Sequence, residues 1–356
     1  MGGETNRRLI QKYGHINLRL RSMFARANLQ QVIGLALLFI VAALISPVAN
    51  RTGQNIFLSG ANLTDIMRQV SEKGIIALGM TFVILTGGID LSVGSLLALS
   101  ATFTANTLTK WKPGIAWGTE IFIVVVLALV ICTAFGTLQG ALIAKLKVQP
   151  FIVTLAGMIG IRGFARFLTT NANIDIGFGD DISALFAKTI QNKTIVICTF
   201  IGLAIIFGII LARTVFGLQV KSVGDNPVAS LYAGLPVTKT LIYTYAISGF
   251  LVGIAGVLHC AQNHQGNPND GVSYELDAIA AVVIGGTSMT GGKGTITGTI
   301  IGAFILGILT NIFRLKGVDI NVEMMCKSVI IVIAVWLQMP RKVKNAARRQ
   351  VTINVQ

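Results

Sequence analysis

Long apolar runs, separated by short polar segments, constrain this chain more than any other feature of its sequence. A helix needs about 20 consecutive apolar residues to cross the hydrocarbon core of a bilayer, and runs of that kind recur along the chain. Only 12% of the residues are charged, against about 25% in ordinary soluble domains. The sequence therefore predicts an all-α polytopic membrane protein with about ten transmembrane helices. They lie near residues 29–48, 64–86, 90–108, 117–143, 150–169, 194–212, 241–261, 276–291, 295–313 and 322–338.

Basic residues gather at the two ends of the chain. Of its 29 lysines and arginines, six lie in residues 1–28 and five in residues 341–356, which matches the excess of positive charge on the cytoplasmic side of membrane proteins. We therefore expect a cytoplasmic N-terminal segment over 1–28, a single membrane domain over 29–340 and a cytoplasmic tail over 341–356. Topology and anionic membrane lipid account for the net charge of +15, so no nucleic-acid partner is expected.

The connecting segments complete this topology. Lys145, Lys147 and Arg213 lie in segments that we place in the cytoplasm, and residues 171–193 and 264–273 then fall outside. The second outer segment, HQGNPNDGVS, is rich in residues that favour turns. Nothing in it predicts a spanning element.

One break in the apolar pattern carries a charge. The stretch TGGIDLSVGS, residues 86–95, interrupts a long apolar run with Gly87, Gly88 and Asp90, although a carboxylate inside a bilayer costs roughly 3 kcal/mol on insertion scales. The glycines let the chain leave one helix without steric cost, and Asp90 can cap the next helix, with the Ser92 hydroxyl nearby. Because non-helical backbone at membrane depth is tolerated only against protein or a wet cavity, the break is either a tight cytoplasmic-side turn or part of a pathway.

Small residues recur every four positions in three apolar runs, and such spacing lets helix backbones approach closely in lipid. They are Gly136 and Gly140, Gly249 and Gly253, and Gly294, Gly298 and Gly302. We expect them to pack helices within the chain; a subunit interface is the alternative. Two stretches of the chain also resemble each other weakly: VILTGGIDLSVGSLLAL and VVIGGTSMTGGKGTITGTIIGAF. This weak internal echo is either a true repeat, as is common in transporters, or a chance match of glycines.

The sequence contains no recognisable catalytic motif. The GGKG of residues 291–294 lacks the spacing of a P-loop, GxxxxGK followed by Ser or Thr, and neither HExxH nor GxSxG occurs. The clearest charges inside the predicted spans are Asp90, Arg162, Arg166 and Lys327. We interpret carboxylates at helix starts, including Glu275 and Asp277, as caps rather than proton relays. The chain is therefore expected to be no enzyme and to bind no cofactor or metal.

A polar loop over residues 213–240 is too long for a tight turn. Within it, Asn226 and Pro227 suit the N-cap and first position of a helix, and Gly234 suits its end. One or two helical turns have little stability alone. We therefore expect this short helix to dock against a partner, with a solvated connecting helix as the alternative.

The same loop resembles the coupling segment of ribose-type sugar permeases of ABC importers, whose pattern is close to GxNxxAAxxxGI. The matching positions are Gly224, Asn226, Ala229, Gly234 and Leu235. A serine stands where the second alanine is usual, and leucine where isoleucine is usual. The resemblance runs in order over about residues 35–338 and includes GMTFVILTGGIDLSVGSLLALSA, VQPFIVTLAGMIGIRG and YELDAIAAVVIGGTSMTGGKGTITGTIIGA.

This resemblance implies a pore subunit in the bacterial cytoplasmic (inner) membrane, with both termini in the cytoplasm. It implies two permeases, identical or related, that form the pore in the lipid. It also implies a separate ABC ATPase subunit that uses ATP and Mg²⁺, and an extracytoplasmic sugar-binding protein that delivers a monosaccharide. The loop over 213–240 would contact the ATPase. The residues implied to face the binding protein are Asp180, Asp181, Asn267 and Asp270.

The sugar cannot be read from the sequence. Candidates for the translocation path, chosen by polarity, depth and the glycine break, are Phe82, Thr86, Gly87, Gly88, Asp90, Ser92 and Asn311. The alternative function is an ion-coupled secondary transporter or channel for a small polar solute, which would work alone and depend on Asp90. The scarcity of mid-span carboxylates and the helix after Asn226 both disfavour it.

Overall fold

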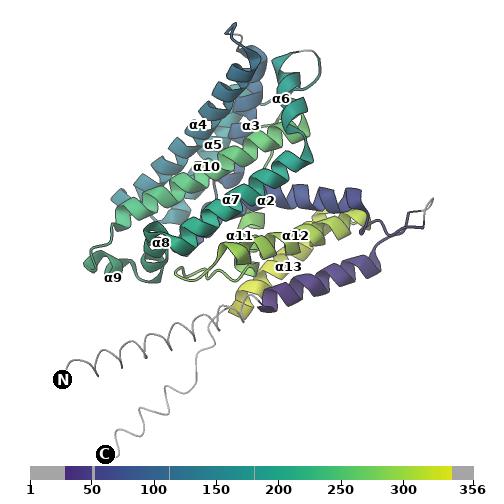
Figure 1. The fold of residues 1–356 in the computed structure, drawn as a ribbon. Coiled ribbons are helices and arrows are strands. Elements are labelled where there is room, and N and C mark those ends of the chain that lie inside the picture. Colours follow the sequence, from purple (N-terminus) through teal and green to yellow (C-terminus); the bar gives the residue numbers. More distant parts are fainter. Residues whose placement is uncertain (1–28, 50–52, 112, 180, 339–356) are drawn as a thin grey trace, which may run out of the picture.

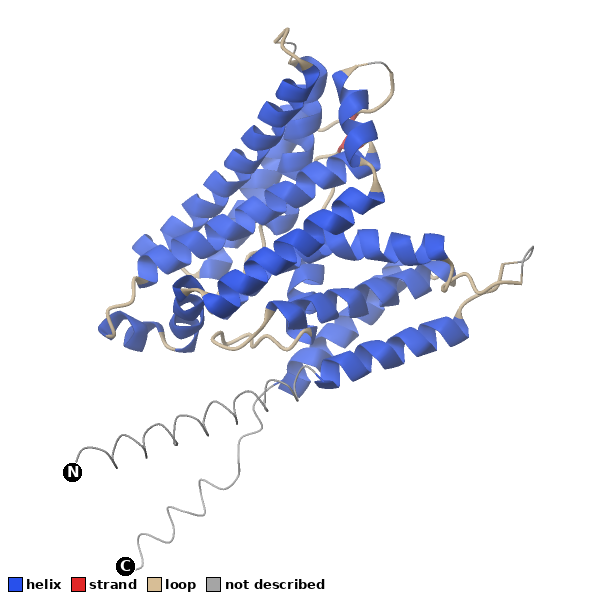
Figure 2. Cartoon of the chain, in the orientation of Figure 1, coloured by secondary structure: helices blue, strands red, loops and turns tan. Residues whose placement is uncertain are grey.

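The structure is a computed structural model in which most of the described chain is helical (Figure 2). It describes residues 29–49, 53–111, 113–179 and 181–338. The two basic end segments predicted over 1–28 and 341–356 lie outside the described residues. In the described part, α4, α5, α7, α10 and α12 are long and apolar enough to cross a membrane, which confirms the prediction of an all-α membrane protein.

The helices follow one another with short connections. The first, Leu29–Ile45, carries no label in Figure 1. The elements that follow it are α2 (Gly60–Leu85), α3 (Val93–Lys110), α4 (Trp117–Leu146), α5 (Pro150–Thr169), β1 (Ile174–Asp175), α6 (Ile182–Ile190), α7 (Lys193–Arg213), α8 (Val215–Asp225), α9 (Pro227–Tyr232), α10 (Val237–Asn263), β2 (Gln265–Gly266), α11 (Tyr274–Ile284), α12 (Ile296–Leu315) and α13 (Ile320–Gln338).

Two groups of helices meet along α2. In Figure 1, α3, α4, α5 and α10 form one group, and α2, α11, α12 and the helix Leu29–Ile45 lie in the other, with α7 beside α2. The second half of α2 is the centre of the core, because every residue from Gly74 to Leu85 is buried. The first glycine break follows directly after this buried stretch.

Glycines bring α4 and α10 into close contact. A Cβ added at Gly136 would overlap the carbonyl oxygen of Tyr245, and one added at Gly249 would overlap that of Cys132. Gly302 of α12 lies against the Ala281 carbonyl of α11 in the same way, and Gly298 lies against the carbonyl of Gly285, which follows α11. The prediction that small residues pack helices within the chain is confirmed for these positions. It is wrong for Gly294, which precedes α12 and whose added Cβ would meet Thr287 of the same loop.

The predicted span over 276–291 is wrong in extent. α11 ends at Ile284 after 11 residues, about 16 Å of helix, which is too short to cross a bilayer. Gly286 adopts a left-handed φ of +83° and ends the helix, and the chain stays non-helical until α12 begins at Ile296. The start of α3 is also later than predicted, at Val93 rather than residue 90.

The segment over 264–273, which the sequence predicts to lie outside and which is called the outer segment below, packs into the bundle. The strands β1 and β2 pair as an antiparallel two-stranded sheet, and Gly266 lies against the backbone of α3 near Thr102. Further along, Gly271 meets Gly94, in the first turn of α3. The segment therefore runs along α3, and α11 begins beside the middle of α2.

Candidate functional site

The break between α2 and α3 holds a fully buried carboxylate. Asp90 Oδ1 accepts hydrogen bonds from the Ser92 backbone N–H at 3.0 Å and the Ser92 hydroxyl at 2.6 Å, and Oδ2 accepts one from the Ser248 hydroxyl of α10 at 2.9 Å. The prediction that Asp90 is the N-cap of α3 is wrong. The N-cap is Ser92, whose side chain makes no capping bond, while Asp90 ties the break to α10.

Helices of the first group close around this break. The Thr154 hydroxyl of α5 donates to the Ile89 carbonyl at 3.0 Å, and the Ser92 hydroxyl donates to Gln139 Oε1 of α4 at 3.1 Å. Gln139 Nε2 and the Tyr245 hydroxyl of α10 are buried without a hydrogen-bond partner among the described residues. The break is thus enclosed by protein, as non-helical backbone at membrane depth requires.

The second glycine break begins in the same way as the first. The Gly88 N–H donates to the Val83 carbonyl, and the Thr287 N–H donates to the Val282 carbonyl, both at 3.1 Å. This six-to-one bond is that of a Schellman motif, which needs a left-handed residue just before the donor. The left-handed residues are Gly87 (φ +78°) and Gly286 (φ +83°). Both breaks therefore begin with the same turn, but the left-handed residue is the first glycine of the pair 87–88 and the second of the pair 285–286.

The loop that resembles a coupling segment forms a corner between α8 and α9. Asn226 Oδ1 accepts a hydrogen bond from the Ala229 N–H at 2.9 Å and caps α9. Gly234 adopts φ +79°, and the Leu235 N–H donates to the Ser230 carbonyl at 3.0 Å. The short helix predicted here is present, with its predicted cap and end.

The corner has a buried side and an exposed apolar side. Val220, Val223 and Gly224 are buried against the bundle, and burial lowers the pKa of the neighbouring Lys221 amine because desolvation disfavours its charged form. Tyr232 is 88% exposed. The other exposed apolar side chains are Val215, Leu218, Val228 and Leu231. An exposed apolar surface of this kind is typical of protein-binding sites.

A buried histidine links the outer segment to the core. His259 Nδ1 of α10 lies 2.6 Å from Glu72 Oε1 of α2, and Nε2 lies 3.0 Å from Asp270 Oδ2. With a carboxylate at each nitrogen, the ring is arranged as a doubly protonated imidazolium. Arg162 of α5 donates to the carbonyl oxygens of Pro268 and Asp270. The outer segment is therefore fixed to α2, α5 and α10.

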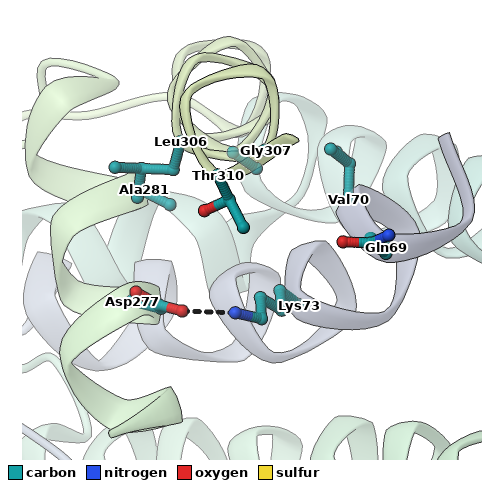
Figure 3. A pocket seen from close by; sticks show the side chains of 9 residues that line it. Gln69, Val70, Lys73, Asp277, Ala281, Leu306, Gly307 and Thr310 are labelled. Carbon is teal, nitrogen blue, oxygen red and sulfur yellow. Dashed lines mark hydrogen bonds and ion pairs between the residues drawn. The ribbon is translucent and has the colours of Figure 1, made fainter. Parts of the chain in front are cut away.

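A second ionic cluster holds α11 to its neighbours. Lys73 Nζ of α2 lies 2.5 Å from Asp277 Oδ2, and Lys327 Nζ of α13 lies 3.6 Å from Asp277 Oδ1 and 2.7 Å from Glu323. Asp277 lies in the first turn of α11, near the helix start as predicted, but the N-cap is Ser273. The prediction that Asp277 caps the helix is wrong, because its carboxylate pairs with the two lysines. Figure 3 shows this pair facing a cavity that Thr310 also lines. At about 30 Å³ the cavity has room for about two water molecules, and not for a sugar.

The residues predicted for the translocation path are not gathered at one place. The Phe82 ring packs edge-on against Phe207, with centroids 5.8 Å apart, and the buried Thr86 hydroxyl bonds within its own helix. Asn311 Nδ2 donates to Asn62 Oδ1 at 2.8 Å, near the start of α2. A helix of 26 residues is about 39 Å long, so Asn311 and the Asp90 break lie near opposite ends of α2. Their assignment to a path stays a prediction.

The residues predicted to face a binding protein have structural contacts. Asp181 caps α6 by accepting a hydrogen bond from the Ala184 N–H at 2.9 Å, and Asn267 Oδ1 accepts one from the Asn269 N–H at 2.8 Å. Asp180 lies outside the described residues. Contact with a binding protein stays a prediction. Over the described part of the chain, no group of three or more His, Cys, Asp or Glu side chains could hold a metal ion.

The chain is similar to known membrane permeases over most of its length. The family model described as "Branched-chain amino acid transport system / permease component" matches residues 62–335. The ribose import permease protein RbsC of Haemophilus influenzae is 39% identical over 307 residues, which cover 85% of this chain and 90% of that protein. RbsC of Escherichia coli K12 is 37% identical over 324 residues, 88% of this chain and 95% of that protein. The xylose transport system permease protein XylH of Haemophilus influenzae is 31% identical over 377 residues, 89% and 98% respectively.

Proposed function

This chain belongs to the family of branched-chain amino acid transport system permease components, and from its ribose and xylose permease relatives we propose that it is the pore subunit of an ABC importer for a monosaccharide. In this proposal it lies in a bacterial inner membrane with both termini in the cytoplasm. A second permease subunit, identical or related, completes the pore.

Two further partners follow from the same proposal. A separate ATPase subunit binds ATP and Mg²⁺ and docks on the cytoplasmic side. An extracytoplasmic binding protein delivers the sugar to the outer side, where Asp181, Asn267 and Asp270 would meet it. The residues that line the sugar's path would include the break that contains Asp90.

The observation that carries the proposal is the corner between α8 and α9. Its inner side is buried, whereas Val228, Leu231 and Tyr232 of α9 are more than half exposed. A helix of six residues has little stability of its own, and a helix that exposes apolar side chains at positions i, i+3 and i+4 suits the groove of a partner protein. We therefore propose α9 as the element that docks into the ATPase subunit.

The test is a mild-detergent pull-down of the tagged chain from its own cells. Gly234 follows α9, is exposed and has nothing within 4 Å of an added Cβ, so Gly234→Arg places a bulky charge at the docking surface without an internal clash. We expect an ATP-hydrolysing subunit to co-purify with the native chain and to be lost from this variant. The matched control is Gly317→Arg, since Gly317 also has a left-handed φ, +65°, and open surroundings.

Two outcomes contradict the proposal. In one, Gly234→Arg retains the ATPase subunit as well as Gly317→Arg does, which removes α9 as the docking element. In the other, the native chain purifies alone and, in liposomes, moves D-ribose without ATP. That second result would favour a transporter that works by itself.

A further inference from the structure

The inner side of the α8–α9 corner touches both glycine breaks. The Gly292 N–H donates to the Leu85 carbonyl at 2.9 Å, and this bond joins the loop between α11 and α12 to the last residue of α2. Gly224, near the end of α8, lies against this hydrogen bond between Gly292 and Leu85. A Cβ added at Gly224 would overlap the Leu85 oxygen and lie 2.7 Å from the Gly292 nitrogen. Three segments distant in sequence thus meet backbone to backbone.

We call the meeting point of Leu85, Gly224 and Gly292 the junction. The loop between α11 and α12 packs as tightly into it as Gly224 does. A Cβ added at Gly291 would lie 2.7 Å from the Gly224 carbonyl oxygen and 3.0 Å from its Cα, and one added at Gly292 would lie 3.0 Å from the Asp225 Cβ. Gly291 and Gly292 both adopt left-handed conformations, with φ of +86° and +75°, which glycine takes without steric cost. The GGKG stretch does not have the spacing of a phosphate-binding loop, and its first two glycines instead allow close backbone contact with α8.

The junction lies between the exposed helix and the interior of the bundle. On its outer side, α8 continues through Asn226 directly into α9. On its inner side, Leu85 immediately precedes the break that contains Asp90, and the loop over 285–295 leads into α12. Long side chains can absorb a small displacement by changing rotamer, but packed backbones with no side chain between them cannot.

We infer that the contact of Gly224 with Leu85 and Gly292 is the point at which movement of α9 reaches both glycine breaks together. This inference rests on the proposed function, because it needs an ATPase subunit that moves α9. Gly224, Gly291 and Gly292 are then positioning residues for transport. They contact neither nucleotide nor sugar, and they set how far a displacement at the cytoplasmic surface is passed inward.

The test measures whether the loop follows α9 in the complex of the full chain with its ATPase subunit in nanodiscs. Spin labels on unnatural amino acids are placed at three exposed positions: Ala233 at the end of α9, Thr290 in the loop, and Thr119 at the start of α4 as the reference. Ala233 is chosen because it is not one of the apolar side chains proposed to dock. The labels leave the native cysteines in place, of which Cys132 and Cys260 are buried. The distances from Thr119 to Ala233 and from Thr119 to Thr290 are recorded with and without ATP and vanadate.

In the native chain, we expect ATP and vanadate to change both distances. In Gly291→Ala, where the added methyl forces the loop away from Gly224, the change at Thr290 falls by more than half while the change at Ala233 persists. The matched control is Gly317→Ala, which also has a left-handed φ, +65°, but nothing within 4 Å of the new Cβ. It keeps both changes. If Gly291→Ala does not assemble, Gly292→Ala with its looser 3.0 Å contact takes its place.

Two results overturn the inference. One is a loop label that moves equally in Gly291→Ala and in the control. The other is a native loop that stays still while α9 moves. In both cases the ATPase subunit is present, so the proposed function stands and the junction alone is wrong. A native chain that binds no ATPase subunit ends the proposed function, and the inference with it.

Discussion

Single charges inside this bundle are held by partners from distant segments. His259 bonds Glu72 and Asp270 through its two ring nitrogens, and the exposed fractions of the His259 and Glu72 side chains are only 6% and 8%. Taking such groups out of water is costly, and each charge is stabilised mainly by the others. Removing one member therefore leaves the remaining carboxylates buried without their cation.

We expect His259→Leu to lower the free energy of unfolding by about 3–5 kcal/mol, because breaking a buried ion pair by removing one partner has that cost. The measurement is the denaturation midpoint of the purified chain in mild detergent, followed by size-exclusion fluorescence. The double variant His259→Leu with Glu72→Leu removes the stranded charge on α2 and should recover part of the loss. A single variant as stable as the native chain would show that the histidine is not the cation of this cluster.

At the scale of the elements, the contact between α4 and α10 depends on two glycines. Gly249 lies against the Cys132 carbonyl and close to the Cα of Gly136, 3.3 Å from an added Cβ. Gly249→Val inserts a branched side chain into this contact, and we expect a loss of about 1–3 kcal/mol, as for other overpacked sites. The readout is again thermal or denaturant unfolding in detergent.

The control for this prediction is Gly202→Val in α7. Gly202 is also a helix glycine in an apolar span, but nothing lies within 4 Å of an added Cβ, so its substitution changes helix propensity without a clash. Equal destabilisation by both variants would mean that α4 and α10 are not packed through Gly249.

The elements differ in how well the sequence predicted them. Apolar length alone located α5, which occupies the predicted residues 150–169, because a long apolar run has no other stable form in lipid. The same rule failed at α11, because the predicted span included the polar and glycine residues 287–291, which follow the left-handed Gly286 that ends the helix. Long-range pairs were beyond such reasoning. His259 and Glu72 are 187 residues apart, and only packing brings them together.

The corner between α8 and α9 could be predicted only in part, because some of its features are local and others depend on distant segments. Capping by Asn226 and the end at Gly234 are local properties of the chain, and both are present. The contact of Gly224 with Leu85 and Gly292 depends on three segments folding together. No spacing rule within one segment contains that information, although the excess of glycine at these sites marked them as unusual.

At the scale of the whole molecule, the ends of the helices define two opposite faces. In Figure 1, the end of α4, the end of α7 and the start of α10 lie on the same face as α8 and α9, whereas α6 lies on the opposite face. Lys145, Arg213 and Lys239 stand at the first face. Since basic residues accumulate on the cytoplasmic side, this face is expected in the cytoplasm.

Labelling with a membrane-impermeant maleimide tests this orientation. Phe178, before α6, is 75% exposed, and Tyr232 on α9 is 88% exposed, so a cysteine at either position is accessible from one side only. We expect Phe178→Cys to react in intact spheroplasts and Tyr232→Cys to react only in inside-out vesicles, each above the background of the native chain with its exposed Cys198. The reverse pattern would place α9 outside the cell, where ATP is scarce, and no ATPase subunit could then dock on it.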